Sequence, residues 1–199
     1  MLTAVVSIAF LFSGAIDAAA IWGGFIPARI GGTSLFESYY RLAPAGLTPL
    51  TATLVHAGLL HLGFNMVMFL YTGRESERAL GGTGIAILYL AGAYAAAAAQ
   101  WLAGPDVQTP MIGASGAISA IVGAYSLLYG RMRARAIGPI PARAVHVLWL
   151  AAAWTGLNLL IGILSADTGM PIAAAAHVGG FAAGLLLARP LLSLRRRWV

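Results

Sequence analysis

The chain has 199 residues with a mean hydropathy of +0.84; 60% of them are hydrophobic and only 9% are charged. A soluble domain carries about a quarter charged residues, so this composition excludes one and indicates a polytopic membrane protein, built as a single domain over 1–199. All twelve basic residues are arginines at the ends of apolar runs, which membrane topology explains better than a nucleic-acid surface, so we expect no nucleic-acid partner. The absence of cysteine excludes disulfides, thiolate metal sites and a cysteine nucleophile.

Six apolar runs are long enough to cross a hydrocarbon core of about 30 Å, which takes about 20 helical residues. The predicted fold is therefore an all-α membrane protein with six transmembrane helices. Frequent Gly and Ala in these runs favour close helix packing in lipid. We expect the spans near 4–25, 50–72, 84–103, 112–130, 144–164 and 171–192.

The first run, 4–25, lacks the basic region of a cleavable signal and is longer than a signal's apolar core, so we expect an uncleaved span. The loop 26–49 after it is punctuated by Gly and Pro and carries Phe36, Tyr39 and Tyr40. It can lie in the membrane interface as an amphipathic segment or act as a plain linker, and the residues favour neither.

The second run carries three polar side chains, His56, His61 and Asn65. His61 and Asn65 are four residues apart and so share one helix face, where an imidazole N–H and an amide N–H can both donate to an oxyanion. The alternative is a polar stripe that joins this span to its neighbours. We expect His56 on a neighbouring face of the same span, in a structural or cavity-lining role.

The fourth run begins with a polar residue among small ones, Gly113-Ala114-Ser115-Gly116. Small neighbours let a substrate backbone approach, and the unpaired N–H groups at a helix start can stabilise an oxyanion. The pattern predicts Ser115 as a nucleophile. The alternative is a serine at a helix interface or helix cap, and both are common in membrane spans.

The last run contains His177, the predicted base for Ser115, followed by the small-xxx-small pair Gly180 and Gly184. An ionisable group inside a span is costly and indicates function, although a histidine can also bond across helices or line a ligand path. No acid lies on this run, and Asp167 is expected too near the surface to orient the ring. We therefore predict a Ser–His dyad and leave a helper residue open.

Arginine placement predicts the orientation. If six spans alternate, the loops near 74–78 and 131–143 and the tail from 189 share one side and hold ten of the twelve arginines. The positive-inside rule then places both termini in the cytoplasm.

Spans two, four and six consequently start at the outer side, and their polar residues lie at similar depth. His146 opens span five at the opposite side and is excluded from this group. Three histidines can bind zinc, but no His-Glu-x-x-His pattern or well-placed carboxylate accompanies them. We therefore predict no metal and no cofactor.

These motifs resemble those of the rhomboid family of intramembrane serine proteases, over about residues 45–190. The segment 113–116 is similar to the family's nucleophile motif, 176–184 to its catalytic histidine with Gly-x-x-x-Gly, 56–65 to its span-two motif, and 77–81 to the loop after it. Two features depart from the family pattern. The outer loop has Tyr40-Arg41 where a Trp-Arg pair is common, and Ser119 stands where an aromatic often lies under the histidine ring.

The resemblance implies an intramembrane serine endopeptidase that cuts single-span membrane proteins near the outer face, in the lipid bilayer of a bacterial plasma membrane. Ser115 and His177 would be the dyad, and the oxyanion would be held by the Ser115 N–H with His61 and Asn65. We expect five further residues to support the site without taking part in the reaction: Gly113, Gly116, His56, Gly180 and Gly184. Two alternatives stay open: a catalytically silent rhomboid-like protein that binds membrane clients, and a small transporter, for which we see no inverted repeat.

Overall fold

The computed structural model describes residues 2–130, 134–165 and 173–196. Regular structure in these ranges is helical apart from two isolated antiparallel bridges, Phe25–Met111 and Ile137–Ile140. The predicted all-α class is confirmed. Three short 3-10 turns (Pro27–Arg29, Ala45–Leu47 and Ala52–Leu54) accompany the helices, which are α1 (Leu2–Ser13), α2 (Ile16–Gly23), α3 (Thr48–Thr51), α4 (Leu59–Ala103), α5 (Ser115–Tyr129), α6 (Ala142–Ser165) and α7 (Ala174–Arg196).

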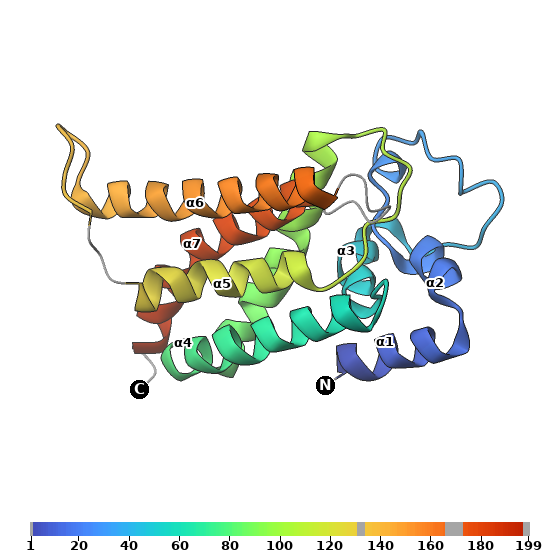
Figure 1. Cartoon of the computed structure of the whole chain (residues 1–199), viewed down its shortest axis with the longest axis horizontal. Coiled ribbons are helices and arrows are strands. Elements are labelled where there is room, and N and C mark those ends of the chain that lie inside the picture. The colour runs from blue at the N-terminus through green and yellow to red at the C-terminus, as the bar shows by residue number, and fades with distance from the viewer. Residues whose placement is uncertain (1, 131–133, 166–172, 197–199) are drawn as a thin grey trace.

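The helix α4 consists of two helices, 59–80 and 82–103, joined at Gly81 (Figure 1). Gly81 has φ 76° and ψ 166°, a conformation open to glycine but strained for other residues. The guanidinium of Arg195 donates from Nη1 to the carbonyls of Glu77 and Arg78, at 2.9 Å each. These bonds satisfy carbonyls at the end of the first half of α4. In place of the loop expected between spans two and three, the structure has a turn at the single residue Gly81.

Among the described helices, α4 and α7 are long and apolar enough to cross a membrane, by length and composition, and α1 and α5 are shorter apolar helices. Each half of α4 measures about 33 Å at 1.5 Å per residue, enough for one crossing. Six crossings and cytoplasmic termini stay predictions. Part of the arginine pattern behind that orientation, at 131–133 and 197, lies outside the described residues, as do Asp167 and the first two residues of the span expected at 171–192.

The centre of the bundle is formed by α5, α7 and the second half of α4, which lie against one another (Figure 1). Glycines bring these helices into backbone contact. A Cβ at Gly180 would collide with the carbonyl of Gly116, and one at Gly184 with the carbonyl of Ala120. A Cβ at Gly92 of α4 would lie 2.9 Å from the carbonyl of Ala117. The small residues of the sequence therefore position α5 and α7 closely enough for their side chains to meet.

The first apolar run differs from the expected continuous span. The helix α1 ends at Ser13, Gly14 takes φ 68°, and the eight-residue helix α2 follows. The reason is local, since glycine adopts this left-handed conformation without a Cβ penalty and ends the helix there. Figure 1 shows α1 beside the first half of α4 and α2 turned away from it.

The loop expected at 26–49 is tied to the rest of the structure. Gln108 accepts a hydrogen bond from the backbone N–H of Leu35 (3.2 Å) and donates to the carbonyl of Thr33 (3.1 Å). In this loop the side chain of Arg29 is 7% exposed and pairs with Glu37 at 3.2 Å. Arg41 is exposed, so the Tyr40-Arg41 pair does not anchor the loop.

Candidate active site

The segment that leads into α5 is held in place by backbone hydrogen bonds to two other segments of the chain. Met111 and Phe25 exchange both of their backbone bonds, at 2.8 and 3.0 Å, and the N–H of Gly113 donates to the carbonyl of Ala52 at 2.9 Å. Gly113 has φ +109°, and a Cβ there would lie 2.7 Å from the ring of His61. Only glycine fits both demands, and the helix begins two residues later at Ser115.

Ser115 and His177 are in direct contact. The Nε2 of His177, near the start of α7, lies 2.7 Å from the Oγ of Ser115, the first residue of α5. The two residues are 62 positions apart, and the close contact of Gly180 with Gly116 one turn away brings them together. The two side chains have the distance that proton transfer from a serine to a histidine requires.

A third residue completes the hydrogen bonding of His177. Its Nδ1 lies 2.6 Å from the Oδ1 of Asn158 on α6, a side chain that is 4% exposed. An amide oxygen only accepts, so Nδ1 carries the proton and Nε2 presents its lone pair to the Ser115 hydroxyl. The sequence reasoning missed Asn158. The signal was available, because Asn158 is an amide in an apolar run and lies near the end at which that run meets the starts of the even-numbered spans.

Ser119, four residues after Ser115, bonds to the backbone and places no aromatic ring under His177. Ser119 is buried and donates from Oγ to the carbonyl of Ser115 at 2.8 Å. The backbone of His177 is fixed from α6 instead, where the indole N–H of Trp154 donates to its carbonyl at 3.1 Å. Trp154 also stacks on Phe181, with centroids 4.9 Å apart and planes 12° apart. The His177 ring is thus held through both nitrogens and its own backbone.

The ring of His61 points its Nε2 atom toward Gly113, next to the start of α5. The backbone N–H of Ala57 donates to Nδ1 at 3.4 Å, so the neutral ring carries its proton on Nε2, the atom that faces Gly113. Asn65 is buried and donates one amide hydrogen to the carbonyl of His61 at 2.8 Å, which leaves the second for another acceptor. His61 therefore presents a hydrogen-bond donor beside Gly113, which lies two residues before Ser115 in the chain.

His56 is not on a helix face, contrary to expectation. It lies in the extended segment between the 3-10 turn ending at Leu54 and the start of α4 at Leu59. Its Nε2 accepts from the N–H of Ala114 at 3.3 Å, and its Nδ1 lies 2.8 Å from the Oγ of Ser7, which itself donates to the Leu54 carbonyl at 2.8 Å. Both ring nitrogens are used by distant segments. His56 therefore links α1 to the residue before Ser115.

Removing the Ser7 hydroxyl tests this link. Ser7→Ala leaves the buried Nδ1–H of His56 and the Leu54 carbonyl without a partner, and each unpaired group of this kind costs about 1–3 kcal/mol. We expect the free energy of unfolding in detergent to fall by about 2 kcal/mol. Ser13→Ala on the same helix is the matched control, because its hydroxyl is exposed and bonds only to its own helix. Equal stability of the two variants would contradict the link.

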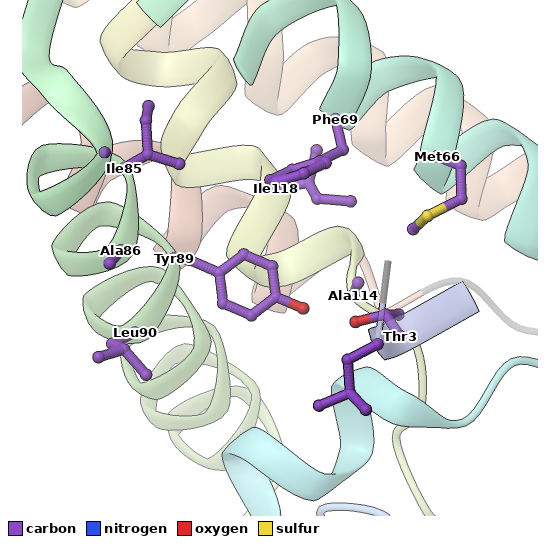
Figure 2. Close-up of a pocket in the computed structure, with 11 residues that line it drawn as sticks. Thr3, Met66, Phe69, Ile85, Ala86, Tyr89, Leu90, Ala114 and Ile118 are labelled. Carbon is purple, nitrogen blue, oxygen red and sulfur yellow. The ribbon is translucent and has the colours of Figure 1, made fainter. Parts of the chain in front are cut away.

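A separate cavity is lined in part by Ala114, the residue before Ser115. It has a volume of about 410 Å³ and is lined by α1, both halves of α4 and the start of α5. Figure 2 shows the Tyr89 ring pointing into it from the second half of α4, with Phe69 and Ile118 beside it. Ser115 and His177 do not line this cavity. Nowhere in the described residues do three His, Asp or Glu side chains lie together as a metal site would need.

The fold and the site define a helical membrane-protein class in which a serine and a histidine from two helices meet within the bundle. The sequence model of the rhomboid domain matches residues 45–194. The chain belongs to the rhomboid family, as its motifs predicted, and its family and apolar helices make it an integral membrane protein.

Curated relatives include both bacterial and mammalian proteins. The chain is 33% identical to rhomboid protease GlpG of Pectobacterium atrosepticum over 138 residues, which is 68% of this chain and 45% of the relative. It is 29% identical to mouse rhomboid-related protein 2 over 143 residues (70% and 46%). It is 40% identical to human rhomboid-related protein 3 over 76 residues (38% and 18%). The chain spans less than half the length of these relatives.

Proposed function

We propose that this chain is an intramembrane serine endopeptidase, a single membrane domain that cleaves transmembrane segments of other proteins near the outer membrane face. The observation that carries the proposal is the 2.7 Å separation of His177 Nε2 from Ser115 Oγ. A hydroxyl that donates to the free lone pair of an imidazole is ready for deprotonation as it attacks. The relative named as a rhomboid protease supports the same reaction.

The reaction is acyl transfer in two steps. His177 accepts the Ser115 proton while Oγ attacks a peptide carbonyl of the substrate, and the imidazolium then donates that proton to the leaving amine. In the second step His177 deprotonates a water molecule that attacks the acyl-enzyme, and Ser115 leaves with its proton restored. Because both residues lie at helix starts, we infer that this water enters from the outer side.

Donors around the start of α5 would stabilise the oxyanion. The Ser115 N–H belongs to the first turn of α5, where backbone N–H groups lack intrahelical partners. The Nε2–H of His61, which faces Gly113, and the second amide hydrogen of Asn65 are the side-chain donors. Preformed donors of this kind typically contribute 10²- to 10³-fold each to such reactions.

The substrates we propose are single-span membrane proteins in the plasma membrane of a bacterium. A transmembrane helix shields its peptide bonds by its own hydrogen bonds, so it must unwind locally before a serine can reach a carbonyl. Residues that weaken a helix, such as Gly or Pro, should therefore favour cleavage when they lie near the outer end of the substrate.

The test is cleavage of a single-span model substrate in proteoliposomes. We expect a cut near the outer end of the substrate helix, and at least about tenfold slower cleavage when the helix-weakening residues there are replaced by leucine. Equal rates for the two substrates would contradict local unwinding. Stable binding of both substrates without any cleavage would contradict the enzyme and favour the client-binding alternative.

A further inference from the structure

A buried amide on α6 bonds to the catalytic histidine candidate through its oxygen and to its own helix through its nitrogen. Asn158 is 4% exposed, its Oδ1 lies 2.6 Å from the Nδ1 of His177, and its Nδ2 donates to the Trp154 carbonyl at 2.9 Å. An amide inside an apolar helix is costly unless its partners are present. Its neighbours along the chain, Leu157, Leu159 and Leu160, are leucines. A polar side chain at 158 is therefore explained by its partner on α7 and not by its own helix.

The direction of the bond to Asn158 decides what His177 can do. Oδ1 accepts only, so it selects the tautomer with the proton on Nδ1 and leaves Nε2 as a free base toward Ser115. In the other tautomer Nε2 carries the proton and donates to the Ser115 oxygen, and the serine then has no base. A wrong tautomer of this kind is highly damaging in serine hydrolases, where it lowers kcat by up to about 10⁴-fold.

We propose that Asn158 is a positioning residue that completes a Ser115–His177–Asn158 triad, with α6 supplying its third member. This rests on the proposed function, since it concerns the base of that reaction. Asn158 does not touch the reacting atoms. It acts through His177: its oxygen fixes the productive tautomer and ring orientation, and it faces the Nδ1–H when the ring takes the serine proton. Trp154, one turn earlier on α6, fixes the His177 carbonyl from the same helix.

Two substitutions separate this role from a local helix effect. Asn158→Asp keeps the Oδ1 acceptor for His177 and loses the Nδ2 donor to Trp154. Asn158→Leu loses both while keeping four side-chain heavy atoms branched at Cγ. If Asn158 only supported its own helix, the two variants would behave alike, because both lose the bond to the Trp154 carbonyl. Thr155→Val, on the same helix, is the matched control for loss of a polar group.

The kinetic expectation is a selective loss of kcat. Asn158→Leu should lower kcat by about a hundredfold with little change in KM, because a tautomer defect leaves substrate binding intact. Asn158→Asp should stay within about tenfold of wild type, and Thr155→Val within about twofold. Equal losses of kcat in the Asp and Leu variants would overturn the proposal, and so would wild-type kcat in Asn158→Leu.

A spectroscopic readout is independent of activity. In protein labelled with ¹⁵N-histidine, NMR shifts distinguish protonated from bare ring nitrogens, and His177→Gln identifies the His177 signals. We expect a protonated Nδ1 and a bare Nε2 in wild type and in Asn158→Asp, and loss of that pattern in Asn158→Leu. A bare Nδ1 in the wild type would overturn the proposal even if the Leu variant fails to fold. The expected tautomer in a wild type that cleaves nothing would overturn the proposed function and the catalytic role, and leave the Asn158–His177 contact as structural.

Discussion

Replacing Ser115 by alanine or His177 by glutamine is expected to lower the cleavage rate by about a thousandfold or more. The first change removes the nucleophile, and the second removes the base that lies 2.7 Å from it. Both groups must act in the same step. Because the two act as one unit, the double variant should be no worse than either single one. The measurement is cleavage of the single-span model substrate by reconstituted protein, with thermal unfolding checked for each variant.

The matched control for the serine is Ser126→Ala, three turns further along α5. It removes the same hydroxyl from the same helix at a position away from His177. We expect it to cleave at the wild-type rate. Substantial cleavage by Ser115→Ala would show that another residue supplies the nucleophile, and the mechanism given above would then be wrong.

The second large effect is expected at Gly184, where α7 touches α5 through the backbone. A Cβ at this position would overlap the carbonyl of Ala120, which cannot turn aside as a flexible side chain could. Gly184→Ala should force the helices apart and lower the free energy of unfolding by about 3 kcal/mol, the upper end of the usual cost of overpacking. Because α7 carries His177, activity should fall with stability. Denaturant unfolding in detergent measures the first effect and substrate cleavage the second.

Gly156→Ala on α6 serves as the control for this experiment. A Cβ at Gly156 meets nothing within 4 Å, and alanine favours a helix over glycine by about 0.5–1 kcal/mol. We expect Gly156→Ala to be as stable as wild type or slightly more so. If the two alanine variants unfolded at the same denaturant concentration, the close packing of α5 on α7 would be contradicted.

Much of the site followed from the sequence because two simple rules acted together. Apolar runs of span length predicted the helices, and their alternation predicted that the starts of the even-numbered runs meet. In the structure Ser115 and His177 are in contact, and the ring of His61 lies against Gly113. The glycines at 180 and 184 are at the helix contact because only small residues let two backbones approach this closely.

The features of the fold and site that the sequence did not reveal depend on the backbone angles of single residues or on contacts between residues distant in sequence. Hydropathy does not register a left-handed glycine inside an apolar run, so the break at Gly14 and the one-residue turn at Gly81 were hidden. His56 was placed on a helix because its run is apolar, whereas its partners Ser7 and Ala114 hold it in an extended segment. Asn158 lies near the end of an odd-numbered run, and the alternation rule was applied only to the starts of the even-numbered runs, although the two reach the same level.

The central claim is that His177 activates Ser115, and covalent labelling of detergent-solubilised protein with a fluorophosphonate probe tests it most directly. Such a probe reacts with activated serines and not with an ordinary hydroxyl. Wild type should be labelled at Ser115, as located by mass spectrometry of the labelled peptide, and Ser115→Ala and His177→Gln should both remain unlabelled. A folded wild type that takes up no label, or a label on Ser115 that survives in His177→Gln, would contradict the claim.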